Sequence, residues 1–170
     1  MPEEYDDPEG REDLEQPPAF FPQNEGPAAD EPKDATLLEV RVEGVFEDVS
    51  NGPSARFVIV ADEIGRKVPI AIGAFESRAI LEAMEGVRPD RPMTHDLVRN
   101  IVEKLGATLE RVAIDDLWNT VYYAKLILTL EDEDDELVVD ARPSDAIALA
   151  LRFQSPIYMS DAIHEQGLDE

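Results

Sequence analysis

The clearest hydrophobic pattern of the chain begins at Asp140, where a short polar segment leads into a helix that has no polar face. Pro143 suits the first position of a helix, where its missing N–H is not needed, and the carboxylate of Asp145 favours the positive end of the helix dipole. Residues 146–151 are all apolar, so the predicted helix must be buried. The polar residues at its entrance are therefore expected to stand on a rigid scaffold.

Alternating apolar and polar positions predict strands before and after two amphipathic helices. The segments with a period of two are 37–43, 56–61, 67–72, 108–114, 122–130 and 137–140. The first three are expected to form a meander, whose first turn is marked by Asn51-Gly52. Because the helices are grouped rather than alternating with the strands, we expect an α+β fold. It should contain a mixed, largely antiparallel sheet of about seven strands and three or four packed helices.

Helical spacing of apolar residues appears in two segments between these strands. In the first, apolar side chains from Phe75 to Met84 share one face and Gly86 ends the helix. In the second, Thr94 is the expected N-cap and Gly106 follows the last turn. Both helices are amphipathic and are expected to pack against the sheet.

The first 35 residues differ in composition from the rest of the chain. They are rich in Pro, Glu, Asp and Gly and poor in aliphatic side chains, so they bury too little apolar surface to offset the entropy lost on ordering. We expect a disordered acidic tail at residues 1–35 and a single domain at residues 36–170. The acidic run 131–136 is expected to be the solvated tip of a hairpin.

Composition limits the classes of protein to which the chain can belong. It has no cysteine, which excludes a disulfide framework, a thiolate nucleophile and a cysteine zinc site. No apolar run approaches the ~20 residues that cross a membrane, and the N-terminus lacks the apolar core of a signal peptide. We therefore expect a soluble, cytoplasmic protein with no membrane partner. Whether it forms a homo-oligomer is left open.

The chain is strongly acidic, with a net charge of −24. Residues 36–170 alone hold 27 acidic and 13 basic residues, so the domain itself is acidic and not only its tail. Scarce lysine beside abundant Asp and Glu leaves open an adaptation to a high-salt cytoplasm. No basic stripe with interleaved aromatic residues, the usual surface for nucleic acid, is visible in the sequence.

Two of the polar groups that could carry chemistry lie at the starts of the predicted helices. His95 could act as a general base, a metal ligand or a phosphate contact, or its position could be incidental. Asp96 sits where a carboxylate favours the helix dipole whatever the function. Glu76, at the start of the first predicted helix, is the candidate in the second group. Arg91 could belong to a cluster of arginines near His95 that contacts phosphate.

The remaining group, at the entrance of the buried helix, is the sharpest. Arg142 beside a helix N-terminus could hold a phosphate, while Asp140 and Asp145 could bind a hard divalent cation such as Mg²⁺ or Mn²⁺. The alternative is an internal salt bridge, in which Asp145 caps the helix and Arg142 neutralises Asp140. The residues alone do not separate the two interpretations.

Several of these segments, taken in order, resemble the bifunctional nuclease family over roughly residues 37–165. They are 68–73 (VPIAIG) with Glu76, 79–80, 85–86, 91–97 (RPMTHDL), 105–106, 123–124, 140–152 (DARPSDAIALALR) and 156–158. The resemblance implies an α+β domain that hydrolyses both DNA and RNA. Position 71 is Ala, where members of the family often carry a large aromatic residue.

From the resemblance and the residues together we expect a nuclease that cleaves phosphodiester bonds in DNA and RNA with the help of a divalent metal ion. The expected catalytic residues are Glu76, His95, Asp96, Asp140 and Asp145, the expected phosphate contacts are Arg91 and Arg142, and the expected metal ligands are Asp140 and Asp145. The alternative is a regulatory or interaction module without enzymatic activity, in which the same polar residues bind an anion or a protein partner.

Overall fold

The computed structural model describes residues 36–50, 54–131 and 135–166, which form seven strands and four helices. The strands are β1 (Leu37–Asp48), β2 (Ala55–Asp62), β3 (Lys67–Ile72), β4 (Ala107–Trp118), β5 (Val121–Leu130), β6 (Leu137–Ala141) and β7 (Ile157–Ser160). The helices are α1 (Ala74–Met84), α2 (Thr94–Lys104), α3 (Pro143–Phe153) and α4 (Asp161–Gln166). None of the helices in these described ranges is long and apolar enough to cross a membrane.

All seven strands join one sheet in the order β3-β2-β1-β7-β4-β5-β6, which confirms the predicted α+β class. β1, β2 and β3 form the predicted antiparallel meander, and β4, β5 and β6 form a second one. The short strand β7 joins the two, because it pairs antiparallel with β1 and parallel with β4. Ile157 lies opposite both Val40 and Val112, so the most central strand of the sheet comes from near the C-terminus.

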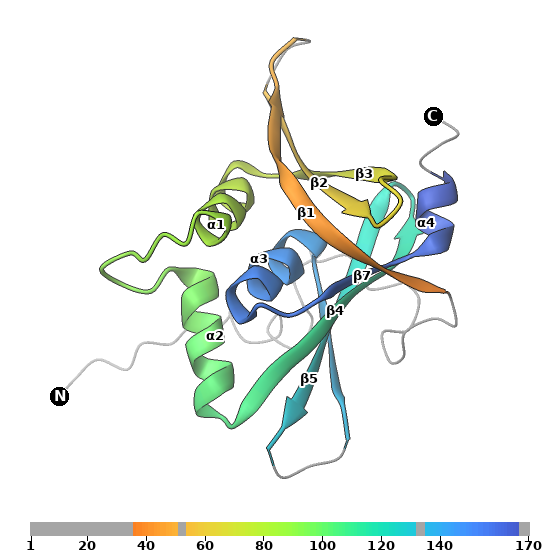
Figure 1. Cartoon of the computed structure of the whole chain (residues 1–170). Coiled ribbons are helices and arrows are strands. Elements are labelled where there is room, and N and C mark those ends of the chain that lie inside the picture. The colour runs from red at the N-terminus through yellow and green to blue at the C-terminus, as the bar shows by residue number, and fades with distance from the viewer. Residues whose placement is uncertain (1–35, 51–53, 132–134, 167–170) are drawn as a thin grey trace, which may run out of the picture.

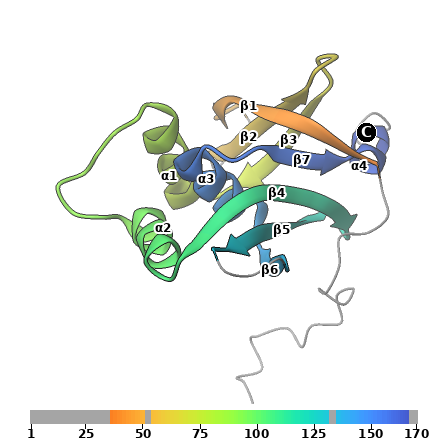
Figure 2. The ribbon, with the colours of Figure 1, turned by 60° about the horizontal axis from the view of Figure 1, so that its bottom comes forward.

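Helix α3 lies in the curve of the sheet, with α1 and α2 on its outer side (Figure 1; Figure 2 shows the same arrangement from below). Ala146, Ile147, Ala148 and Ala150 are completely buried, as the absence of a polar face predicts. They pack in one core with residues of β1, β2, β4, β5 and β7. Truncating Ile147 to Ala would cost about 2–5 kcal/mol, so the helix is a rigid support for the residues at its N-terminus.

The two amphipathic helices differ from the expectation that they lie on the sheet. Because α3 fills the concave face, α1 and α2 pack mainly against α3, and their smaller contacts with the sheet are to β1 and β2 for α1 and to β4 for α2. No residue of α2 is fully buried, and the side chains of Leu97 and Ile101 remain about half exposed. Thr94 is not the cap that we expected, because the helix already includes it and the N-cap is Met93.

The curvature brings two distant parts of the sheet together. The β3 strand is one edge of the sheet, which accommodates Pro69 because an edge position does not need every N–H for pairing. The hydroxyl group of Tyr122, at the start of β5, lies 3.5 Å from the carbonyl oxygen of Pro69. The end of β3 therefore faces the β4–β5 turn and the start of α3.

Three predictions concern segments outside the described residues. These are the acidic tail at residues 1–35, the turn at Asn51-Gly52 and the middle of the acidic run 131–136. The strands on either side of the last two are antiparallel neighbours, as the hairpin prediction requires.

Candidate active site

The first turns of α1, α2 and α3 meet at one place. Glu76 belongs to the first turn of α1, His95 to that of α2 and Asp145 to that of α3, and Arg142 is the N-cap of α3. His95 contacts Asp145, and Arg142 contacts both Asp145 and Glu76. These four side chains, which we call the active cluster, include four of the seven site residues expected from the sequence.

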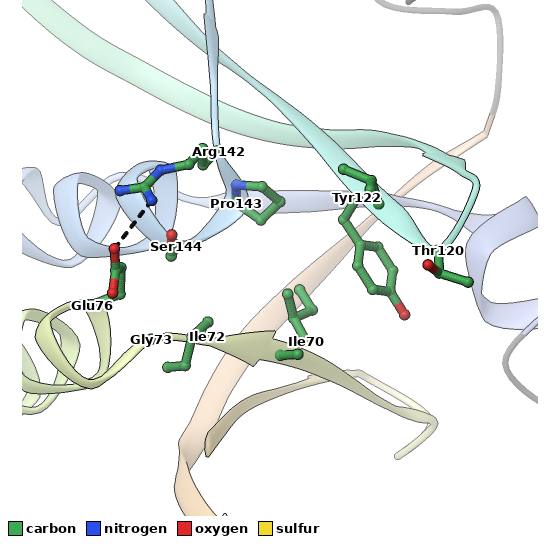
Figure 3. A pocket seen from close by; sticks show the side chains of 11 residues that line it. Ile70, Ile72, Gly73, Glu76, Thr120, Tyr122, Arg142, Pro143 and Ser144 are labelled. Carbon is green, nitrogen blue, oxygen red and sulfur yellow. Dashed lines mark ion pairs between the residues drawn. The ribbon is translucent and has the colours of Figure 1, made fainter. Parts of the chain in front are cut away.

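Arg142 links the two carboxylates of the cluster. Its Nε donates to Asp145 Oδ2 at 2.7 Å and its Nη2 donates to Asp145 Oδ1 at 3.2 Å, a two-pronged contact. Its Nη1 lies 3.1 Å from Glu76 Oε1, the ion pair drawn as a dashed line in Figure 3. The hydrogen bond with Asp145 raises the pKa of Arg142 above its ordinary value. Because 65% of the side chain is exposed, this guanidinium is also open to a ligand.

His95 and Asp145 form a hydrogen-bonded pair. His95 Nε2 lies 2.9 Å from Asp145 Oδ1, across 50 residues of sequence, and the His95 side chain is only 14% exposed. Burial raises the pKa of Asp145, but the hydrogen bonds from Arg142 and His95 outweigh burial and hold that pKa below its ordinary value. Asp145 is therefore an anion that orients the imidazole ring of His95 and leaves Nδ1 for another partner.

Glu76 is held over the backbone at the start of its helix. A Cβ atom added to Gly73 would overlap Glu76 Oε2, so a residue with a side chain at position 73 would displace the carboxylate. Gly73 is the N-cap of α1 and has an ordinary extended conformation, so the close approach and not the backbone angle explains the glycine.

Asp96 faces away from the cluster and ties α2 to α3. Its Oδ2 accepts a hydrogen bond from the backbone N–H of Met93, and its Oδ1 accepts one from Arg152 Nε at 2.6 Å. Arg152, which is largely buried, also donates to the carbonyl oxygens of Ala79 and Ala148. Both oxygens of Asp96 are therefore engaged in holding helices, and its expected catalytic role stays a prediction.

Two other expected residues are not brought into the cluster. Asp140 lies opposite Lys125 in the β5–β6 ladder, and the next residue, Ala141, packs against the core on the α3 side of the sheet. Because successive residues of a strand point to opposite faces, Asp140 points to the other face, where Lys125 pairs with Asp115. Arg91 lies exposed in the α1–α2 connection and lines neither of the hollows described below.

The residues of the cluster do not form a ready metal site. Glu76 and Asp145 supply the oxygen ligands that hard cations prefer, but Arg142 already pairs with both. Asp140, the other expected ligand, points to the opposite face of the sheet. Within the described residues, no group of three or more His, Asp or Glu side chains is placed to hold a metal ion.

The Glu76–Arg142 ion pair separates two hollows. The first, of about 370 Å³, lies between the starts of α1 and α2 and is lined by His95 and Asp145 in addition to the pair itself. The second, of about 440 Å³, lies between β3, the β4–β5 turn and the start of α3, and is shown in Figure 3. A ligand held by Arg142 can therefore extend into either hollow.

Comparison with known proteins places these residues in a family. The family model of the bifunctional nuclease domain matches residues 58–168, a range that contains the whole active cluster. The chain belongs to the bifunctional nuclease domain family.

Three relatives illustrate the range of similarity. An uncharacterized protein of Mycobacterium tuberculosis is 42% identical over 131 residues, which cover 76% of this chain and 75% of the relative. The protein called bifunctional nuclease 2 of Arabidopsis thaliana is 32% identical over 63% of this chain and 33% of its own length. Bifunctional nuclease 1 of Oryza sativa subsp. japonica is 30% identical over 59% of this chain and 31% of its own length.

Sequence reasoning missed four residues of this site in the bifunctional nuclease domain. Gly73, Ser144, Tyr122 and Thr120 line the second hollow, and sequence analysis assigned a functional role to none of them, although Gly73 and Ser144 lie in segments that carry the family resemblance. Thr120 is a β-branched residue with a φ of 63°, a conformation that glycine or asparagine usually adopts, and only the structure reveals it. The sequence Asn119-Thr120 could have suggested a tight two-residue turn between β4 and β5. It gives no sign that this turn lies on the same hollow as Arg142.

Proposed function

We propose that the protein hydrolyses phosphodiester bonds of DNA and RNA at the active cluster. The observation that carries this proposal is the meeting of three helix first turns around one histidine, one arginine and two carboxylates. Membership of the bifunctional nuclease domain family supports it, as do the names of the plant relatives.

Electrostatics favour a phosphate at this place. Each helix N-terminus carries the equivalent of about +0.5 charge, and the exposed guanidinium of Arg142 adds a full positive charge. Together these offset the charges of Glu76 and Asp145, although residues 36–170 as a whole are acidic. A phosphodiester that approaches Arg142 would exchange with one of its carboxylate partners, and the two-pronged geometry of a guanidinium suits phosphate as well as carboxylate.

His95 is the residue placed to move a proton. With Nε2 held by Asp145, its Nδ1 is the nitrogen available to take a proton from a water molecule in the first hollow. The water oxygen then forms a bond to phosphorus while the bond from phosphorus to the leaving oxygen breaks. The leaving oxygen takes a proton from solvent, and Arg142 stabilises the negative charge that develops on the phosphate. His95 returns its proton to solvent.

The divalent metal ion expected from the sequence stays a separate prediction. The mechanism above uses the side chains of the cluster, because their arrangement does not match a metal site. Addition and removal of Mg²⁺ and Mn²⁺ therefore form one arm of the test. Full activity in the presence of a chelator would support the mechanism as written. If a chelator abolishes activity and either ion restores it, Glu76 and Asp145 would have to exchange their ion pairs with Arg142 for bonds to the metal ion.

The test measures cleavage of labelled single-stranded DNA and RNA by the purified protein and by His95→Gln, in which the amide can still bond to Asp145. Removal of a general base should lower kcat by about 10²–10⁴-fold and change KM little. The matched control is His164→Gln, which alters the other histidine, outside both hollows. It should keep the kcat of the wild type at temperatures where it is folded.

Equal loss of activity in both histidine variants would indicate a general folding effect, and equal retention in both would indicate a contaminating nuclease or a wrong site. Full activity in His95→Gln would overturn this assignment of the site. Absence of cleavage by well-folded wild-type protein, together with binding of an anion or protein partner, would favour the alternative of an interaction module.

A further inference from the structure

The second hollow is not used by the chemistry proposed above, although it shares Glu76 and Arg142 with the first. It lies where the end of β3 faces the start of β5 and the start of α3 (Figure 3). Its volume of about 440 Å³ falls within the range of pockets that hold a small organic group. The lining residues indicate which kind of group fits.

The walls of this hollow are largely apolar and include one aromatic ring. Tyr122 reaches from β5 toward Ile70 of β3, with Pro143 beside it (Figure 3). Ile72 and Val121 complete the apolar lining. A flat group can stack on a tyrosine ring and contact aliphatic side chains on its other face, which is how proteins bind unpaired bases without reading their sequence.

Polar groups lie at the edges of the same hollow. The hydroxyl group of Ser144, in a residue that is only 8% exposed, has no hydrogen-bond partner among the described residues. β3 is an edge strand, so alternate backbone N–H and C=O groups along residues 70–72 are not used by pairing with β2. A flat ligand with donors and acceptors on its rim would satisfy these groups.

We propose that this hollow, the base slot, holds one unstacked nucleobase of a single strand whose neighbouring phosphate contacts Arg142. The assignment of the phosphate rests on the proposed function. Arg142 lines both hollows, and a nucleotide joins a charged phosphate to a flat base within one residue, so one ligand spans the two sites. A base paired and stacked in a duplex must first be extruded to enter the base slot, so the protein selects single-stranded nucleic acid.

Binding measurements separate this proposal from the proposed function. Fluorescence anisotropy would follow short phosphorothioate single strands and the matching duplex, which resist cleavage, with the full chain. The variants are Tyr122→Leu, which removes the aromatic face, and Tyr122→Phe, which keeps it. Phe46→Leu is the matched control, since Phe46 is an exposed aromatic residue that lines neither hollow.

Loss of one base-stacking contact should weaken single-strand binding by Tyr122→Leu about 5–150-fold. Tyr122→Phe and Phe46→Leu should bind as the wild type does, and the duplex should bind more weakly and respond little to Tyr122→Leu. In wild-type protein, a nucleoside monophosphate should displace the labelled strand far more effectively than inorganic phosphate does. This last measurement needs no variant, so it holds even if Tyr122→Leu does not fold.

Equal displacement by nucleoside monophosphate and inorganic phosphate would overturn the base slot, as would equal affinity of wild type for single strand and duplex. If unmodified strands are cleaved but Tyr122→Leu binds and cleaves them as the wild type does, the proposed function stands and the base slot fails. If the strand binds with the expected dependence on Tyr122 but is never cleaved, the base slot stands and the proposed hydrolysis fails.

Discussion

Two regions of the molecule each contain a histidine, an aspartate and an arginine, but the histidine is hydrogen-bonded to the aspartate in only one of them. In the active cluster, His95 is bonded to Asp145, which is bonded in turn to Arg142. Near α4, His164 lies beside Arg66, and Asp62 accepts a hydrogen bond from Arg66 Nε at 2.6 Å. His164 is only 2% exposed, and neither of its ring nitrogens has a hydrogen-bond partner among the described residues.

The difference shows what makes a histidine ready for chemistry in this fold. His95 has a carboxylate that orients the ring, and it lines a hollow from which a ligand can reach it. His164 has no such partner, and burial together with the nearby charge of Arg66 lowers the pKa of its ring below the ordinary value, against the opposite effect of Asp62 and Asp161. A histidine that lies near an Asp–Arg pair is therefore not, for that reason alone, ready for proton transfer. The bond from histidine to carboxylate and the opening to solvent distinguish the two regions.

The largest expected effect comes from exchanging the aspartate in each region. Asp145→Asn should lower kcat by about 10²–10⁴-fold, because an amide does not hold the imidazole of His95 in the orientation and charge environment that proton transfer needs. Asp62→Asn should lower the melting temperature, since it weakens the bonds to Arg66, and should leave kcat unchanged. Steady-state kinetics and thermal unfolding of both variants check this pair, and a loss of kcat in Asp62→Asn would erase the distinction between the regions.

An intermediate effect is expected from cutting the link that positions His95. Arg152→Met removes the bond from Arg152 Nε to Asp96 and two bonds to backbone carbonyls, at a cost of about 2–3 kcal/mol of unfolding free energy. Because Asp96 fixes the start of α2, which carries His95, kcat should fall as well, although the side chains of His95 and Arg142 are intact. Denaturant unfolding and kinetics measure the two effects. Normal kcat at reduced stability would show that His95 does not depend on this link.

The smallest effect concerns the pH dependence that His164 introduces. A histidine whose pKa is lower in the folded state binds protons preferentially when unfolded, so its contribution to stability is present above about pH 6.5 and is lost as the pH falls below that value. His164→Leu should remove this component. It should also raise stability at neutral pH by about 1 kcal/mol, since it removes buried ring nitrogens that lack partners. Unfolding free energies measured across this pH range for both proteins check the prediction, which fails if the slopes are the same.

Local patterns in the sequence were sufficient for most of the secondary structure. Strand periods of two and the apolar spacing of three helices predicted the elements, because these patterns depend only on neighbouring residues. The short strand β7 and the short helix α4 were not predicted as separate elements, since four and six residues are too few to show a period. The packing of α1 and α2 was only partly anticipated, because the sequence does not show that α3 occupies the face of the sheet.

What the sequence by itself determined is the burial of α3, the α+β class and the set of polar residues from which a site could be built. Only the tertiary structure decided which of them meet. Glu76, His95 and Asp145 come together because α1 and α2 each pack on α3, whose Arg142 and Asp145 link the three first turns, and no local pattern records that packing. Asp140 is excluded by the alternation of side chains along β6, since its neighbour Ala141 faces the core. The base slot likewise exists only because the curvature of the sheet brings β3 opposite Tyr122, a contact across 53 residues.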